Sequence, residues 1–304
     1  MRDATFYLNQ VRALEDVGVN CETLSVPGST IGTDAADNRS PVDYLRFFPQ
    51  VFDEASTEYD VVHANYGLTA PHALAQSSCP VVLTLWGSDL FGEFGWLSKL
   101  CARRADAVIV MSEEMDRELP CESTVIPHGV DFEQFAPVPQ ERAQKQLGWD
   151  SDAHHVLFPS PIAREEKDFP RSERVVDAAR SRLDADIELQ TPNGEIPHDE
   201  MPVWMNAADV LLLTSKREGF PNTVKEALAC NLPVVSTDVG GLSTVLNDIE
   251  PSAVGRTDDE LVDAVVSTLR DDERANGREQ IADLSLERMA EQIRDVYERV
   301  LDEA

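Results

Sequence analysis

The sequence predicts an α/β protein made of two domains, each built on a parallel sheet. Short apolar runs of strand length alternate with helical patterns of ten or more residues along most of the chain. Apolar runs without polar alternation are typical of parallel strands that helices cover on both faces. A proline-rich stretch after Asp131, DFEQFAPVPQ, separates two such series. We therefore expect two Rossmann-like domains that face a cleft.

The predicted strands fall into two series. The first comprises Cys21–Val26, Asp60–Ala64, Pro80–Leu85, Ala107–Met111 and Thr124–Pro127, and the second comprises His155–Phe158, Asp186–Gln190, Asp209–Thr214 and Pro233–Thr237. From Thr257 onward the pattern indicates helices only. We place one domain at residues 1–137, the other at 138–284, and a terminal helix at 285–304.

Residues 3–18, DATFYLNQVRALEDVG, form an amphipathic helical pattern ahead of the first predicted strand. A helix that leads into a parallel strand normally follows another strand, because the right-handed β-α-β crossover is the unit of such sheets. The first strand of this domain is therefore missing. Either the first element is helical, or the natural protein begins upstream of Met1, and we favour the second explanation.

The chain is strongly acidic, with a formal net charge of −30 and a pI near 4.4. A nucleic acid is an unsuitable partner because its phosphates would meet charge of the same sign. Lysine is scarce, at 5 residues among the 26 basic ones. This composition indicates a halophilic protein, because molar salt shortens the Debye length to ~3 Å and screens self-repulsion. An acidic protein of ordinary salinity is the alternative.

The cysteine pattern and the hydropathy indicate a cytoplasmic protein. Five scattered cysteines without a C-x-x-C pair argue against a structural zinc site and a disulfide framework. No apolar run approaches the ~18 residues that span a bilayer, and no secretory signal is visible. A position at the cytoplasmic face of a membrane is compatible with these features.

The segment 215–231, SKREGFPNTVKEALACN, follows a predicted buried strand. Ligands of open α/β sheets bind at such carboxyl ends. Asn222 is the predicted N-cap of a short helix, whose free N–H groups and dipole suit a diphosphate. Gly219 allows close approach of the backbone. Glu226 lies about one turn inside the helix and Glu218 across the loop, and a carboxylate accepts hydrogen bonds from two adjacent sugar hydroxyls.

The longer string SKREGFPNTVKEALACNLPVVSTDVGG resembles the donor-site motif of the family-four retaining glycosyltransferases with the GT-B fold. Further similar segments occur in the family's order: YDVVHANYG, PVVLTLWGSDL, RRADAVIVMSEEM, VIPHGVDFEQFAP and HDEMPVWMNAADVLLLTS. The resemblance implies that Glu226 holds the ribose hydroxyls of a nucleotide and that Glu218 contacts the donor sugar. It also implies that a loop lines the sugar and phosphate pocket through its backbone: Gly219, Phe220, Pro221, Asn222 and Thr223.

A second loop, PIAREEKDFP, follows the strand at 155–158. The family uses an arginine and a lysine there to hold the diphosphate and stabilise charge on the leaving group. Arg164 and Lys167 are three residues apart, whereas most members have a spacing of five, so Lys167 matches more firmly than Arg164. Lys167, Lys216 and Lys225 all lie in or beside the two loops, which favours an anion site; surface salt bridges are the alternative for Lys216 and Lys225.

On the acceptor side, the resemblance points to residues after the strand at 80–85. Gly87 and Asp89 follow that strand, and Asp89 is expected to orient an acceptor hydroxyl. Trp86 stands where many members carry a histidine, and it either stacks on a sugar ring or packs internally. His63 either lines the cleft or is buried.

Two aspartate triplets, DSD at 150–152 and DAD at 184–186, match the D-x-D pattern of metal-dependent glycosyltransferases. Neither follows a strand end, such triplets arise by chance in an acidic chain, and the family needs no metal, so we assign none. The absence of G-x-G-x-x-G disfavours a nicotinamide dehydrogenase. The segment 90–107, LFGEFGWLSKLCARRADA, either touches a membrane-borne acceptor or packs in the core.

The resemblance implies that residues 1–137 form the acceptor-side domain, that residues 138–284 form the nucleotide-sugar donor domain and that the helix at 285–304 packs back on the first domain. It also implies metal-independent transfer of a hexose-type sugar, with retention, from a nucleoside diphosphate sugar to a hydroxyl acceptor. A uridine diphosphate sugar is favoured over a guanosine diphosphate sugar. The product would be a glycan, glycolipid or polysaccharide, and a lipid-linked acceptor with peripheral membrane contact is one form of this reaction. The alternatives are a sugar-nucleotide epimerase with the same fold and a non-catalytic sugar-nucleotide-binding or partner subunit.

Overall fold

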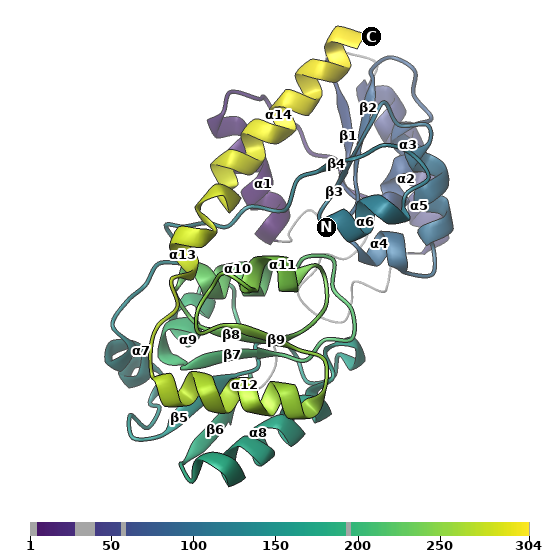
Figure 1. The fold of residues 1–304 in the computed structure, drawn as a ribbon. Coiled ribbons are helices and arrows are strands. Elements are labelled where there is room, and N and C mark those ends of the chain that lie inside the picture. The colour runs from purple at the N-terminus through teal and green to yellow at the C-terminus, as the bar shows by residue number, and fades with distance from the viewer. Residues whose placement is uncertain (1–4, 28–39, 56–58, 193–195, 304) are drawn as a thin grey trace. The chain divides into compact units, whose positions relative to one another are not determined.

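The computed structural model describes residues 5–27, 40–55, 59–192 and 196–303. The chain divides into two compact units (Figure 1), which are Met1–Gly129 together with Leu286–Ala304, and Val130–Ser285. Each unit contains one parallel sheet, so the predicted α/β class is confirmed. The irregular stretch after Asp131 belongs to the second unit.

The first unit has a four-stranded sheet in the order β1-β2-β3-β4. Its strands are β1 (Val62–Ala64), β2 (Val81–Thr84), β3 (Ala107–Val110) and β4 (Thr124–Val125). Its helices are α1 (Thr5–Asp16), α2 (Pro41–Ala55), η2 (Gly67–Thr69), α3 (Ala70–Ala73), α4 (Ser88–Phe91), α5 (Gly95–Ala102), α6 (Glu113–Glu118) and α14 (Leu286–Glu303). The first and last of these, α1 and α14, pack against each other (Figure 1).

One predicted strand is wrong, because residues 21–26 form no strand in the structure. Val26 instead packs against Phe47 and Val51 of α2. The apolar pattern of this segment therefore reflects packing against a helix. Among the described residues, β1 pairs only with β2, so the segment has no strand partner for its backbone hydrogen bonds.

The second unit has a five-stranded sheet in the order β6-β5-β7-β8-β9. Its strands are β5 (His154–Leu157), β6 (Ile187–Gln190), β7 (Val210–Leu213), β8 (Val234–Thr237) and β9 (Ala253–Gly255). The sequence prediction missed β9, which has only three residues. Its helices are α7 (Gln140–Leu147), η3 (Glu165–Lys167), α8 (Phe169–Leu183), α9 (Met201–Ala207), α10 (Asn222–Ala229), α11 (Leu242–Leu246), α12 (Asp258–Asp271), α13 (Gly277–Gln280) and η4 (Ala282–Leu284).

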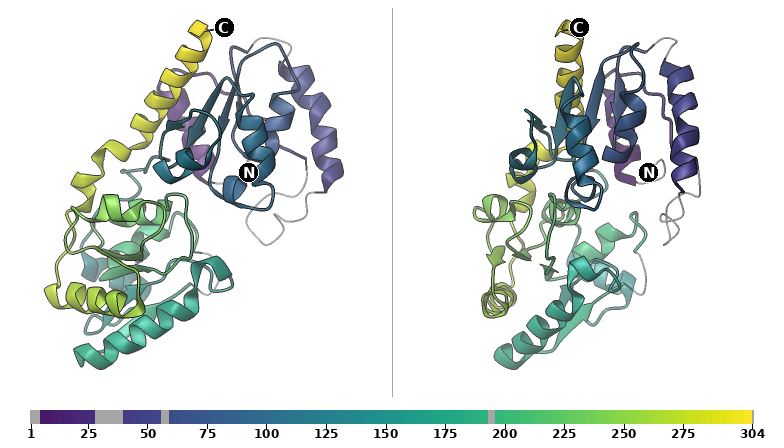
Figure 2. Two further views of the ribbon diagram at one scale, coloured as in Figure 1. Left: turned by 45° about the vertical axis from the view of Figure 1, so that its right-hand side comes forward. Right: turned by 90° about the vertical axis from the view of Figure 1, so that its right-hand side faces the viewer.

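Both faces of this second sheet are buried, as the central strand β7 illustrates. Val210 and Leu212 point into a cluster formed with residues of α8 and α12. Leu211 and Leu213 point into a second cluster, which contains residues of α9, α10 and α11. Figures 1 and 2 show α8 and α12 side by side along one face of the sheet. This two-sided burial explains why the strand is apolar at every position.

None of the helices in the described part of the chain is both long and apolar enough to cross a membrane.

Candidate active site

The strand order of the second sheet identifies the carboxyl ends of β5 and β7 as the expected ligand site. The chain goes from β5 outward to β6 and then returns to the other side of β5 to form β7. In open parallel sheets, ligands bind outside the carboxyl ends of the strands at such a switch point. The two loops that leave β5 and β7 therefore define the candidate site: η3 with its flanks, and the β7–α10 loop (residues 214–221).

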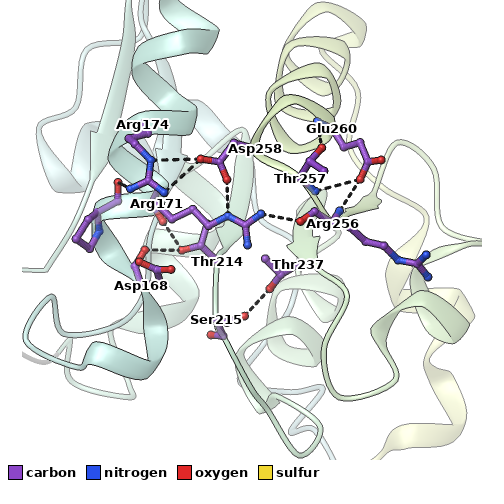
Figure 3. A network of polar contacts seen from close by, with 12 residues as sticks. Asp168, Arg171, Arg174, Thr214, Ser215, Thr237, Arg256, Thr257, Asp258 and Glu260 are labelled. Carbon is purple, nitrogen blue, oxygen red and sulfur yellow. Dashed lines mark hydrogen bonds and ion pairs between the residues drawn. The ribbon is translucent and has the colours of Figure 1, made fainter.

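Hydrogen bonds hold these two loops together. Ser172 Oγ lies 2.7 Å from Thr214 Oγ1. Thr214 Oγ1 lies 3.0 Å from the carbonyl oxygen of Lys167 and 3.1 Å from that of Asp168 (Figure 3). Because the single Thr214 proton is directed at the two carbonyls, Ser172 donates to Thr214. The Lys216 N–H donates to the carbonyl of Glu166 over 2.9 Å. The end of β7 thus fixes the position of η3.

Lys167 and Glu218, predicted separately as site residues, meet at this point. Lys167 Nζ donates to Glu218 Oε1 over 2.5 Å, and their side chains are only 12% and 13% exposed. An ammonium group has three donors, so this contact leaves two for an anionic ligand. The pair combines a phosphate-binding cation with a hydroxyl-binding carboxylate.

Arg164 is not brought into this pair. Its side chain is 53% exposed and forms an ion pair with Glu166, with 2.5 Å between Nη2 and Oε1. The three-residue spacing places Arg164 before η3 and Lys167 at its end, so the two side chains leave the turn at different points. Its assignment as a catalytic residue stays a prediction.

The start of α10 differs from the prediction in one respect. Asn222 is the first residue of the helix and Pro221 occupies the N-cap position, with φ −68° and ψ 120°. The prediction of Asn222 as N-cap was wrong because proline fixes φ in a range that suits the extended residue before a helix. Pro221 makes no side-chain hydrogen bond to this terminus, and the Val224 N–H donates to the Pro221 carbonyl over 3.2 Å. Among the described residues, the N–H groups of Asn222 and Thr223 are thus left for an anion.

The loop after β8 packs closely on the β7–α10 loop. Gly240 has φ +58°, and a Cβ atom built there would lie 2.9 Å from the carbonyl oxygen of Gly219. Thr237 Oγ1 donates to the Ser215 carbonyl over 2.7 Å (Figure 3). The hydroxyl of Ser215 itself is buried and has no hydrogen-bond partner in the part of the chain that the structure describes. The close packing of Gly240 against Gly219 thus supports the loop that carries Glu218.

Glu226 projects from α10 toward a histidine that the sequence analysis missed. His198 Nε2 lies 3.0 Å from Glu226 Oε1, and the Glu226 side chain is 14% exposed. The hydrogen bond to Glu226 raises the pKa of His198, although burial acts in the opposite direction. His198 is the first residue of the segment HDEMPVWMNAADVLLLTS, which resembles the family. The resemblance by itself assigns no role to this histidine.

The three lysines of the site have different environments. Lys167 forms the pair described above, and the Lys216 side chain is exposed. Lys225 is fully buried, with Nζ 4.8 Å from the centre of the Phe220 ring. Burial lowers the pKa of Lys225 to about 7. The surface salt-bridge alternative therefore does not apply to Lys225.

The acceptor-side residues lie in the first unit, where several contribute to the local structure. Asp89 is 4% exposed, and its carboxylate oxygens accept 2.8 Å hydrogen bonds from the N–H groups of Gly67 and Trp86. The indole Nε1 of Trp86 donates to Asn65 Oδ1 over 2.9 Å, and its ring centroid lies 4.7 Å from that of Phe6. Gly87, with φ 100°, precedes α4. Their roles toward an acceptor stay predictions.

His63 has both ring nitrogens engaged. Nδ1 lies 2.6 Å from Tyr297 Oη of α14, and Nε2 lies 2.7 Å from Thr84 Oγ1 of β2. Burial lowers the pKa of His63 to about 4, so the imidazole is neutral at pH 7. His63 is half-buried and both ring nitrogens are engaged within the first unit, and its role in lining the cleft stays a prediction.

The two D-x-D triplets lie before strands: residues 150–152 precede β5 and residues 184–186 precede β6. Both are therefore at the opposite end of the sheet from the η3 and β7–α10 loops. Among the described residues, no group of three or more His, Cys, Asp or Glu side chains is arranged to hold a metal ion.

Similar solved structures show that the architecture is the GT-B fold. Sucrose-phosphate synthase from Thermosynechococcus elongatus is similar with a TM-score of 0.71 and 20% identity, over 86% of this chain and 79% of that one. A glycosyltransferase from Rickettsia africae is similar with a TM-score of 0.74 and 14% identity, over 98% and 95% of the two chains. At these identities the similarity establishes the fold.

Family models extend this assignment to the sequence. Residues 12–134 match the family described as Glycosyltransferase Family 4, and residues 170–271 match Glycosyl transferases group 1. The two segments together cover more than half of the chain. The protein belongs to the family-four, group 1 glycosyltransferases.

Curated relatives agree with this membership. The chain is 29% identical over 216 residues to the putative teichuronic acid biosynthesis glycosyltransferase TuaC of Bacillus subtilis. The aligned region covers 61% of this chain and 55% of TuaC. It is 29% identical over 243 residues to the lipopolysaccharide core biosynthesis mannosyltransferase LpsB of Rhizobium meliloti, covering 68% and 69%. The chain thus spans little more than half the length of TuaC.

Proposed function

We propose that the protein transfers a sugar from a nucleoside diphosphate sugar to a hydroxyl acceptor in the biosynthesis of a glycan, glycolipid or polysaccharide. The observation that carries the proposal is the Lys167–Glu218 pair at the β5/β7 switch point. The uncapped start of α10 and Glu226 lie on the next element of the same unit. This combination offers donors to a diphosphate and acceptors to sugar hydroxyls.

The donor is proposed to be a uridine diphosphate sugar rather than a guanosine diphosphate sugar. The similar Anabaena protein HepE, with a TM-score of 0.67 and 17% identity, was solved in complex with UDP and glucose. Glu226 would accept hydrogen bonds from the ribose hydroxyls and Glu218 from the sugar, with Gly219 and the α10 start next to the phosphates. The acceptor would meet Trp86, Gly87 and Asp89 of the first unit.

The proposed reaction retains the configuration of a hexose-type sugar and needs no metal ion. The bond between the anomeric carbon and the β-phosphate oxygen breaks, the acceptor oxygen bonds to that carbon, and the acceptor proton passes to the departing phosphate. Lys167 and the α10 N–H groups would stabilise the negative charge that develops on the phosphate, assisted by Arg164. The protein supplies position and charge rather than a nucleophile.

A contact with a membrane surface and a lipid-linked acceptor are part of this proposal, at the cytoplasmic face. α5 and the residue before it expose large apolar side chains: Phe94, Trp96 and Leu100 are 49%, 65% and 40% exposed. The exposed side chains of Arg103 and Arg104 follow directly. Apolar residues beside basic ones are suited to an anionic lipid surface.

Binding of uridine diphosphate tests the donor site. Titration of the full chain in molar potassium chloride should raise its melting temperature, because a ligand that binds only the folded state stabilises it by mass action. Glu226→Ala should abolish this shift. An equal shift in both proteins would contradict the donor-site assignment.

Product analysis separates the transferase from its alternatives. With a sugar nucleotide and an acceptor, we expect a glycosylated acceptor and free nucleoside diphosphate. Conversion of the sugar nucleotide to an isomer without acceptor would identify an epimerase. Binding without turnover against a panel of acceptors would favour the non-catalytic subunit.

A further inference from the structure

We propose that His198 is a positioning residue that makes the site selective for ribose, by fixing the orientation of the Glu226 carboxylate. This inference deepens the proposed function and rests on it. It concerns contacts within the second unit only.

The side chains of Gln134, His198 and Glu226 form a hydrogen-bonded relay. His198 Nε2 lies 3.0 Å from Glu226 Oε1. On the other side of the ring, Gln134 Nε2 lies 3.2 Å from His198 Nδ1 and 3.0 Å from the backbone oxygen of His198. The side-chain amide of Gln134 therefore holds both the ring and the main chain of the residue that contacts Glu226.

The relay determines where the imidazole proton resides. An amide NH₂ group only donates, so His198 Nδ1 accepts from Gln134 and the proton of the neutral ring is on Nε2. That proton points to Glu226 Oε1. The hydrogen bond fixes one carboxylate oxygen, and Glu226 Oε2 accepts no hydrogen bond within the described part of the chain. One oxygen of Glu226 is thus held by the protein while the other is available to a ligand hydroxyl.

Neighbouring groups keep the relay rigid. The Phe135 ring packs edge-on against His198 with a centroid separation of 5.3 Å. Asp131 Oδ1 accepts from the backbone N–H of Gln134 over 2.9 Å, so the residue that supplies the amide is itself anchored. The other charged groups near His198 and Glu226 are Asp199 and the buried Lys225.

A fixed carboxylate discriminates between ligands in a way that a mobile one does not. A site built to hydrogen-bond a hydroxyl group rejects an analogue without it, because the buried acceptor is then left unpaired. If His198 holds Glu226 in the orientation that meets the ribose hydroxyls, its loss should weaken ribonucleotides selectively. A ligand without those hydroxyls should not be affected.

The experiment measures the affinity of the full chain for uridine diphosphate and for 2′,3′-dideoxyuridine diphosphate by calorimetry in molar potassium chloride. The unmodified chain should bind uridine diphosphate at least about tenfold more tightly, equivalent to ~1.4 kcal/mol. His198→Leu should lose most of this preference while its affinity for the dideoxy compound stays the same. His198→Gln, which keeps an N–H donor without a titratable ring, should retain the preference. His154→Leu, at the start of β5, is the matched control and should behave as the unmodified chain.

The outcomes separate this proposal from the proposed function. If the unmodified chain binds neither compound, the donor site fails and the role of His198 fails with it. If the unmodified chain prefers uridine diphosphate and Glu226→Ala removes the preference, the donor site stands. In that case, an undiminished preference in His198→Leu, or an equal loss of both ligands in His198→Leu and His198→Gln, would overturn the positioning role alone.

Discussion

Lys167 Nζ and Glu218 Oε1 are 2.5 Å apart although 51 residues separate them in the chain. The contact exists because β5 and β7 are neighbours in the sheet, so the turn after one strand meets the loop after the other. A cation and an anion that are both largely shielded from solvent neutralise each other more effectively than an exposed pair.

Replacing Lys167 should reduce catalysis more than donor binding. Lys167→Met removes the cation proposed to stabilise the leaving diphosphate, and we expect the turnover number to fall by roughly 10²–10³-fold. Affinity for uridine diphosphate should fall by about tenfold, the effect of one charge-assisted hydrogen bond. Steady-state kinetics and calorimetry measure the two effects. Lys145→Met, on the exposed surface of α7, is the control, and equal losses in both variants would contradict the role of Lys167.

Gly240→Ala should damage the donor loop as well as the stability. A β-carbon there would lie 2.9 Å from Gly219 O at a positive φ, so both strain and a backbone contact oppose it. We expect a loss of about 1–3 kcal/mol in the free energy of unfolding and weaker binding of uridine diphosphate. Gly148→Ala also has positive φ, at +71°, but meets nothing within 4 Å. It should cost stability without changing affinity; an unchanged affinity in Gly240→Ala would show that the close packing is unimportant to the site.

The His198–Glu226 pair should make stability depend on pH in a defined direction. The hydrogen bond to Glu226 raises the pKa of His198 in the folded state. The stabilisation is therefore fully present below the unfolded pKa of ~6.5 and is lost as the pH rises through the higher folded pKa. The melting temperature of the unmodified chain minus that of His198→Gln should be largest near pH 5.5 and should decrease toward pH 8.5. A difference that is constant or increases over this range would contradict the prediction.

Salt should stabilise the protein despite its surface ion pairs. Asp258 of α12 accepts from Arg171 at 2.7 Å and pairs with Arg174 at 3.2 Å on α8 (Figure 3). Solvent reaches the Asp258 carboxylate, and salt weakens ion pairs that solvent reaches. The net charge of −30 produces a larger repulsion that salt also screens. We expect the melting temperature to rise between 0.1 M and 2 M potassium chloride. Asp258→Asn should retain this increase, whereas a decrease in the unmodified chain would contradict the proposed halophilic character.

Contact with a membrane surface depends on the exposed residues of α5. Trp96→Ser should lower the fraction of protein that sediments with vesicles containing phosphatidylglycerol, because burial of an aromatic side chain drives such binding. Leu301→Ser removes an apolar side chain that is 42% exposed on α14 and should have no effect. Equal sedimentation of all three proteins would argue against α5 as the contact.

Local patterns in the sequence were sufficient for the main elements of the fold. Eight of the predicted strand segments overlap strands β1–β8, because uniform apolar runs report burial on both faces. The predicted strand at residues 21–26 failed for the converse reason: apolar residues also pack against helices, as Val26 does on α2. β9 was missed because three residues give too short a pattern to recognise.

Residue types and their spacing were sufficient to predict the parallel α/β architecture, the loop–helix segment from Ser215 to Asn231 and the family to which the chain belongs. These properties depend on residue type and on spacing within about thirty positions. Which side chains meet could not be predicted in this way, because it depends on how the elements pack in three dimensions. Glu226 with His198, Lys167 with Glu218 and His63 with Tyr297 are 28, 51 and 234 residues apart. Their contacts depend on the order of strands and on the packing of α14, because hydrogen bonds act over a few ångströms in space and not along the chain.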